Sequence, residues 1–330
     1  MMHETLYRSR APVRISFAGG GTEVSPYVDE HGGCVVSATI TKYAWSNMQL
    51  SRDSRIMLED TFSKNKTYED LDHLEYDGDL DLLKAVVKNF KPETGLSLYM
   101  RNDIPPRSGL GSSASAFASA IGLFNELGET KLTEYQIAEL AYRLERDELG
   151  NKGGRQDQYA AVFGGINFIE FKTDGSVRVD PLKMKRNHLL ELEKNMILVY
   201  TMDRSVSGDI IEDQTNQYVK GRGKTREGLE ETKNIALEIN QALLNGNLNR
   251  FGELLHRAWE SKKKFSPLIT NKDIDRIYTL ARENGALGGK ISGAGGGGHM
   301  ILYCESGREM AVKKKLMDLG LHIVGFNFDF

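Results

Sequence analysis

The segment PPRSGLGSSASAFASAIGLF (residues 105–124) joins two prolines, a glycine and serine cluster and a run of small apolar residues. Gly109 and Gly111 lie where a loop enters a helix that we predict over residues 112–127. The first backbone N–H groups of a helix lack intrahelical acceptors, and the helix dipole favours an anion there. Small side chains let phosphate oxygens approach such a backbone. The segment therefore predicts a phosphate-binding loop, although a serine cap on a closely packed helix explains the same residues.

Two familiar nucleotide-binding motifs fit the glycines of this chain poorly. Residues 109–114 match the spacing of a dinucleotide-binding fingerprint, but DIPPRS separates them from the preceding strand. Residues 293–298 match it too, but a strand-like segment follows them instead of a helix. The GKT at residues 223–225 lacks the glycine that a Walker A loop requires, because position 218 is Tyr218. An NAD-dependent dehydrogenase and a P-loop enzyme are therefore disfavoured.

Composition indicates an ordinary soluble protein. The 330 residues are 40% hydrophobic and 27% charged, and the formal net charge is -3. Such a balance gives no reason to expect nucleic acid or a membrane surface as a partner, and the basic run Lys262–Lys264 is interpreted as a solvated helix end. Cys34 and Cys304 cannot form a disulfide framework, and no HExxH pair indicates zinc. No leader or membrane span is recognisable, so a cytoplasmic location is expected.

The first half of the chain is predicted to alternate strands and helices. Predicted strands cover residues 13–19, 34–50 and 95–102, and predicted helices cover residues 82–90, 112–127 and 133–150. One face of the last helix carries Ile137, Leu140, Ala141 and Leu144. Gly150 is a suitable C-terminal cap for that helix. The polar and acidic residues 51–80 are interpreted as a surface loop or hairpin.

The second half has a clearer order of elements. Strands are predicted at residues 195–201, 286–292, 297–304 and 322–328, and helices at residues 226–244, 248–263, 307–320 and before Gly285. This order reduces to β-α-β-β-α-β, the ferredoxin-like split βαβ pattern, with extra helices in the first crossover. We therefore expect two domains, residues 1–190 and 191–330.

Three segments together resemble the sequence motifs of the GHMP kinases, the small-molecule kinases named for galactokinase, homoserine kinase, mevalonate kinase and phosphomevalonate kinase. They are APVRISFAGGGTE (11–23), PPRSGLGSSASA (105–116) and KISGAGGGGHMILY (290–303), in the order and spacing of that family. The resemblance implies an α+β fold, with an N-terminal domain like ribosomal protein S5 domain 2 and a ferredoxin-like C-terminal domain. It also implies a kinase that uses ATP and Mg²⁺. The ATP phosphate loop would consist of Arg107, Ser108, Gly109, Leu110, Gly111, Ser112, Ser113, Ala114 and Ser115.

The resemblance also assigns the chemistry that phosphoryl transfer requires. Ser113 and Glu145 would be the Mg²⁺ ligands, although an exposed helical carboxylate paired with Arg143 or Arg146 is the simpler interpretation of Glu145 from sequence alone. Asp157 matches the catalytic aspartate, either as the base or as the group that orients the substrate hydroxyl. Arg14 would lie near the transferred phosphoryl group and Asp157, with a buried structural ion pair as the alternative.

The substrate is expected between the first motif and the second domain. The predicted contacts are Gly20, Gly21, Thr22 and Glu23 from the first motif, Asp157, and Gly293, Ala294 and Gly295 from the third. In sugar kinases of the family the position of Glu23 is commonly aspartate, so the longer side chain is a departure. A phosphorylated substrate needs its own cations, for which we single out Arg155 and Arg204, with Arg107 and Lys152 behind them.

Within the family the segments GGGTE, GGRQDQYAAVFGG and YTMDRSVS most resemble the D-glycero-D-manno-heptose 7-phosphate kinases. That resemblance implies phosphorylation of the anomeric hydroxyl, which gives the 1,7-bisphosphate for nucleotide-activated heptose and surface polysaccharide. Another anomeric sugar kinase, such as an L-fucose kinase, is the leading alternative. A catalytically silent sugar or nucleotide sensor on the same fold is another. The expected partners are small molecules, and a homodimer is compatible with this interpretation.

Overall fold

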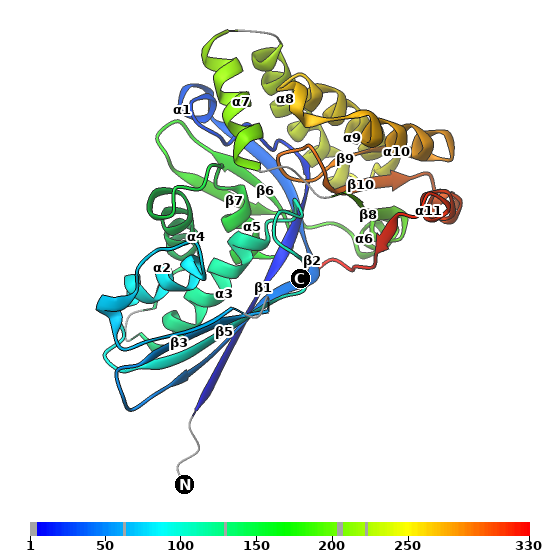
Figure 1. The fold of residues 1–330 in the computed structure, drawn as a ribbon. Coiled ribbons are helices and arrows are strands. Elements are labelled where there is room, and N and C mark those ends of the chain that lie inside the picture. Colours follow the sequence, from blue (N-terminus) through cyan, green and yellow to red (C-terminus); the bar gives the residue numbers. More distant parts are fainter. Residues whose placement is uncertain (1–4, 62–63, 129–130, 203–206, 222–223) are drawn as a thin grey trace.

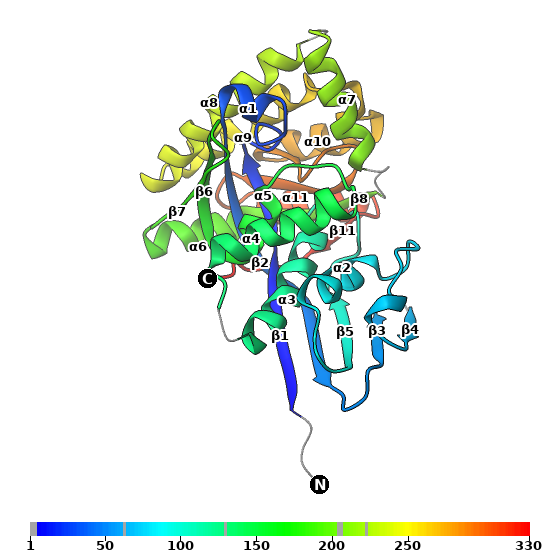
Figure 2. The ribbon, with the colours of Figure 1, turned by 90° about the vertical axis from the view of Figure 1, so that its left-hand side faces the viewer.

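The protein is built on two β-sheets, with helices α7 to α10 at the end of the molecule opposite the N-terminus (Figures 1 and 2). The structure is a computed structural model and describes residues 5–61, 64–128, 131–202, 207–221 and 224–330. No helix within these ranges is both long enough and apolar enough to cross a membrane.

The larger sheet has the order β4-β3-β5-β2-β6-β7, with β1 paired to β2. Its strands are β1 (Leu6–Ala18), β2 (Gly33–Leu50), β3 (Ile56–Asp60), β4 (Asn65–Tyr68), β5 (Leu96–Asn102), β6 (Ile166–Phe171) and β7 (Val177–Pro181). Strand β2 is long enough to pair with β6 through its first half and with β5 through its second half. The acidic segment before β5 contains the β3–β4 hairpin, which confirms the prediction of a hairpin there. Strand β3 also runs parallel to β5.

Helices α2 to α5 gather beside this sheet (Figure 1). They are α2 (Asp81–Phe90), α3 (Ser112–Leu127), α4 (Glu134–Arg143) and α5 (Gln156–Phe163), while the short α1 (Tyr27–His31) follows the first motif. The apolar face predicted for α4 packs into the core beneath α3. Helix α4 continues as one π-helical turn, Leu144–Glu148, and Gly150 follows it with a left-handed φ of 69°, as its predicted capping role requires.

The smaller sheet is wholly antiparallel in the order β11-β8-β10-β9. Its strands are β8 (Met196–Met202), β9 (Ala286–Ile291), β10 (Gly298–Cys304) and β11 (His322–Val324). Helices α7 (Ser207–Val219), α8 (Thr225–Leu244), α9 (Leu248–Lys263) and α10 (Lys272–Glu283) connect β8 to β9, α11 (Glu309–Asp318) connects β10 to β11, and α6 (Arg186–Asn195) precedes β8. This arrangement confirms the ferredoxin-like pattern.

The last predicted strand is shorter than expected. Strand β11 ends at Val324, and the chain then returns to the larger sheet, where the Asn327 carbonyl accepts a hydrogen bond from Thr41 N (2.9 Å). Phe328 is buried there, so burial of an aromatic ring against β2 replaces continued pairing in the smaller sheet.

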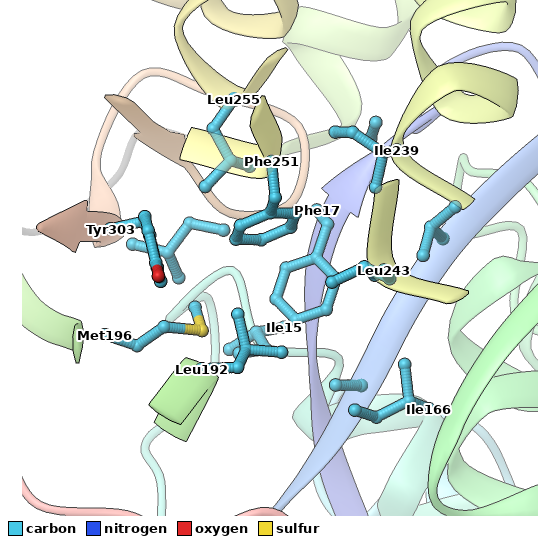
Figure 3. Close-up of a cluster of buried hydrophobic side chains, with 14 of the residues drawn as sticks. Ile15, Phe17, Ile166, Leu192, Met196, Ile239, Leu243, Phe251, Leu255 and Tyr303 are labelled. Atoms are coloured by element: carbon cyan, nitrogen blue, oxygen red, sulfur yellow. The ribbon is translucent and has the colours of Figure 1, made fainter. Parts of the chain in front are cut away.

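One hydrophobic cluster joins the two halves of the chain (Figure 3). Phe17 of β1 meets Phe251 of α9 edge to face, with ring centroids 5.1 Å apart, and Phe251 meets Tyr303 of β10 at 5.3 Å. Such contacts fix β1 and the first motif against the C-terminal helices. The domain boundary near residue 190 stays a prediction, because this core continues across it.

Candidate active site

A cleft of about 820 Å³ lies where the three glycine-rich segments meet. Its walls come from the end of β1, the loop before α3, the loop that precedes α5, helix α7 and the turn between β9 and β10. Among the predicted site residues, those that line it are Arg14, Gly21, Glu23, Arg107, Ser108, Gly109, Gly111, Ser112, Ser113, Glu145, Lys152, Asp157, Gly293 and Ala294. Residues from all three motifs thus share one cavity.

The loop before α3 is held in an unusual backbone conformation. Gly109 and Gly111 adopt left-handed φ values of 83° and 74°, and Arg107 adopts 62° although it is not glycine. Leu110 is fully buried and Ala114 nearly so. Ser115 donates through its hydroxyl to Pro12 O (2.7 Å). These last three residues therefore support the loop from the protein side instead of lining the cleft.

Arg14 and Asp157 form a partly buried pair against this loop. Asp157 Oδ1 accepts from Arg14 Nε at 2.8 Å and from Arg14 Nη2 at 2.5 Å. Arg14 Nη1 also donates to Gly109 O at 2.7 Å. A Cβ placed on Gly111 would lie 3.4 Å from Asp157 Oδ2. The arginine therefore occupies one carboxylate oxygen and leaves the other facing the helix entrance.

Glu145 lies in the π-helical turn and is only 4% exposed. Gln158 Nε2 donates to its Oε2 at 2.6 Å. No described residue donates a hydrogen bond to Oε1, and the residue lines the same cleft as Ser113. The simpler interpretation is thus wrong about exposure, although the expected pairing with Arg146 is present, since Arg146 Nη2 lies 3.7 Å from Glu145 Oε2. A buried carboxylate oxygen and a hydroxyl at a helix N-terminus fit Mg²⁺, which usually takes few protein ligands beside waters and phosphates.

Glu23 is a buried carboxylate that lines the cleft. Its Oε2 accepts from Gly21 N at 2.7 Å, and its Oε1 accepts from Gln156 Nε2. Burial raises the pKa of this carboxyl above its ordinary value. Thr22 does not reach the cleft, because it is fully buried and its hydroxyl donates to Gly19 O at 2.8 Å. Gly20 is buried beside Gln156.

The turn between β9 and β10 contributes only its first residues to the cleft. Gly293 and Ala294 line the cavity. Gly295 instead packs on Ile269, since a Cβ placed there would lie 3.1 Å from the Ile269 backbone. Gly296 N donates to Ile269 O at 2.8 Å, which fixes the turn on the segment that follows α9.

The basic residues predicted to hold a substrate phosphate are dispersed. Arg155 does not line the cleft, because it donates to Gly175 O at 2.9 Å and its guanidinium lies 4.9 Å from the centre of the Tyr142 ring. Arg204 lies outside the described residues. Arg107 and Lys152 do line the cleft, and Lys152 pairs with Glu212 of α7.

Lys262 is a cleft residue that the sequence interpretation missed. It is 4% exposed, lines the cavity and donates to Gly293 O at 2.6 Å. The interpretation of Lys262 as part of a solvated helix end is therefore wrong. Periodicity could have found it, because residues 251, 255, 258 and 262 fall on one face of α9.

Known proteins resemble this chain over nearly its whole length. The family description "GHMP kinases N terminal domain" matches residues 81–165, and "GHMP kinases C terminal" matches residues 239–316. The D-glycero-alpha-D-manno-heptose 7-phosphate kinase of Campylobacter jejuni is 37% identical over 328 residues, which cover 97% of this chain and 96% of that protein. The chain belongs to the GHMP kinase family. As a member of that family, it is an ATP-dependent small-molecule kinase.

Two further relatives of this GHMP kinase are sugar kinases. The crystal structure of a D-glycero-D-manno-heptose 1-phosphate kinase from Bacteroides thetaiotaomicron superposes with a TM-score of 0.82 at 33% identity, over 98% of this chain and 96% of that one. The L-fucokinase/L-fucose-1-P guanylyltransferase of Bacteroides fragilis is 26% identical over 93% of this chain, but the match spans only 35% of that longer protein.

Proposed function

We propose that this GHMP kinase transfers the γ-phosphoryl group of ATP to the anomeric hydroxyl of D-glycero-D-manno-heptose 7-phosphate. The product would be the 1,7-bisphosphate, an intermediate for nucleotide-activated heptose and surface polysaccharide made in the cytoplasm, where ATP is supplied. The observation that carries the proposal is the Arg14–Asp157 pair, packed against the phosphate loop in the cleft that also contains Glu23. The similarity to heptose phosphate kinases supports the choice of sugar.

In this proposal Asp157 acts on the hydroxyl that attacks the phosphoryl group. Arg14 holds Oδ1, so Oδ2 is the oxygen that accepts the hydroxyl proton or orients the hydroxyl. The Arg14 guanidinium also carries the positive charge that the transferring phosphoryl group needs. Glu23 and the Gly21 backbone contact sugar hydroxyls. The loop at residues 107–113 binds the phosphates of ATP through backbone N–H groups and the start of α3.

Ser113 and Glu145 would hold Mg²⁺, which when bound neutralises negative charge on the phosphates. Substituting Glu145→Gln should lower kcat about tenfold or more and raise the Mg²⁺ concentration needed for half-maximal rate, because a neutral amide is a weaker ligand than a carboxylate. Titration of activity against Mg²⁺ measures both effects. The matched control is Asp147→Asn, which changes an exposed carboxylate two residues away. An identical Mg²⁺ dependence in E145Q and wild type would remove Glu145 from the metal site.

Lys152 is the cleft residue that we assign to the phosphate of the substrate, with Arg107 as a second candidate. Arg155 is left out because it does not line the cleft and its guanidinium donates to Gly175 O. Lys152→Ala should raise KM for the phosphosugar roughly tenfold and leave KM for ATP unchanged, on the scale of one charge-assisted hydrogen bond. Lys172→Ala, an exposed lysine after β6, is the control. Equal KM values for K152A and K172A would refute this assignment.

A coupled ADP-release assay with Mg-ATP tests the substrate. The panel consists of heptose 7-phosphate, heptose 1-phosphate, mannose 6-phosphate, L-fucose and galactose. Turnover that strongly favours heptose 7-phosphate supports the proposal. Preference for heptose 1-phosphate would mean that the hydroxyl that reacts is not the anomeric one but lies at the other end of the sugar. Preference for free L-fucose would favour the alternative that the fucokinase relative supports. No turnover on any sugar would favour a silent sensor.

A further inference from the structure

His299 lies at the start of β10, directly behind the phosphate loop. The residue is 2% exposed, and its ring lies 5.1 Å from the ring of Tyr200 on β8. Strand β10 is fixed at this point, because Thr201 Oγ1 donates to Gly298 O at 2.8 Å. His299 belongs neither to the proposed phosphate loop nor to the proposed catalytic residues. These roles therefore do not explain why a histidine is buried at this position.

Two groups of His299 contact one carbonyl of the loop. Its backbone N–H donates to Ser108 O at 3.1 Å, and its ring Nδ1 lies 2.9 Å from the same oxygen. A carbonyl oxygen only accepts, so Nδ1 carries the proton. Burial lowers the pKa of His299, which favours the neutral ring over the charged one. The approach is close, because a Cβ on Gly298 would lie 2.4 Å from Ser108 O.

Ser108 is one of three consecutive loop residues whose backbone carbonyls accept hydrogen bonds from β1 or β10. Gly109 O accepts from the Arg14 side chain at 2.7 Å, and Leu110 O accepts from Arg14 N at 2.9 Å. Three consecutive carbonyls of the loop are therefore tied to the protein interior. Carbonyl oxygens repel phosphate, whereas backbone N–H groups bind it, so turning the carbonyls inward prepares a loop for an anion. Two of the three anchors come from β1 and one comes from β10.

We propose that His299 is a positioning residue for the nucleotide: its Nδ1–H holds Ser108 O and thereby keeps the phosphate loop in its anion-binding conformation. The inference rests on the proposed role of residues 107–113 as the ATP phosphate loop. It also gives the C-terminal half of the chain a direct part in ATP affinity, through one side chain that does not line the cleft that contains Glu23.

Binding of Mg-ATP without sugar, measured by calorimetry, tests the inference on three variants. In His299→Asn the amide nitrogen can take the place of Nδ1, whereas His299→Gln places its amide near the position of Nε2 and His299→Leu offers no donor. We expect Kd for Mg-ATP to rise at least about tenfold in H299Q and H299L, and to stay within about threefold of wild type in H299N. KM for the sugar at saturating ATP should change little in all three.

The outcomes separate this inference from the proposed function. Wild-type protein that does not bind Mg-ATP would refute the proposed function itself. Wild-type binding with equal affinity in H299L and H299Q would overturn the role of His299 and leave the kinase assignment intact. An equal loss in all three variants would also overturn it, because a general packing defect does not distinguish asparagine from glutamine. Melting temperatures identify a variant that fails to fold, and Gly298→Ala, which must displace Ser108 O, then gives an independent test of the same contact.

Discussion

Replacing Asp157 by asparagine is expected to lower kcat by at least about two orders of magnitude and to leave ATP affinity nearly unchanged. The amide keeps the size of the side chain but cannot take a proton, and its nitrogen cannot accept from Arg14. ATP affinity is preserved because the contact between Arg14 Nη1 and Gly109 O does not involve the carboxylate. Steady-state rates and Mg-ATP binding by calorimetry measure the two quantities separately.

The control for Asp157→Asn is Asp147→Asn, the same chemical change at an exposed position. It should have wild-type kcat. If D157N turned over at the rate of D147N, Asp157 would have no place in the mechanism, and Arg14–Asp157 would be a structural ion pair only. A large fall in ATP affinity in D157N would instead assign the carboxylate to the phosphate loop.

The second large effect is expected for Arg14→Lys, which keeps the positive charge but loses the planar fork. Arg14 donates to Asp157 Oδ1 through two nitrogens and to Gly109 O through the third, and a single ammonium cannot reproduce that geometry. We expect kcat to fall by about two orders of magnitude, and Kd for Mg-ATP to rise as well, because Gly109 O loses its partner. This double effect distinguishes Arg14 from Asp157.

Arg8→Lys is the matched control for Arg14→Lys, since Arg8 is an exposed arginine of the same strand. R8K should match wild type in kcat and in ATP affinity. If R14K retained at least half of the wild-type kcat, the positive charge alone would suffice and the fork geometry would be unimportant. If only ATP affinity fell, Arg14 would serve the loop and not the reaction.

The parts of the site that the sequence predicted are those with a local backbone requirement. Gly109 and Gly111 need left-handed φ values, and the loop before α3 needs little side-chain bulk, so both leave a visible pattern in the chain. The order of elements in the second half was equally visible, because glycine-rich or polar turns separate β9, β10 and α11 in the sequence. Their antiparallel sheet follows from that order.

The parts that the sequence did not predict depend on contacts made far along the chain. Arg155 is a long side chain whose direction is set by Gly175 O and Tyr142, neither of which is implied by its neighbours. Glu145 was predicted as a ligand, but its burial beside Gln158 of another helix, which donates to it, was not. His299 is one histidine in a strand, and only the approach of Ser108, 191 positions earlier, gives it a partner. Such residues carry no local pattern.

Phosphorus NMR of the product formed from heptose 7-phosphate and Mg-ATP tests the central claim most directly. The account predicts ADP and a sugar with two phosphate signals, the original one at the 7-position and a new one coupled to the anomeric proton. A new phosphate on any other carbon, or the appearance of inorganic phosphate in its place, would contradict the proposed transfer to the anomeric hydroxyl.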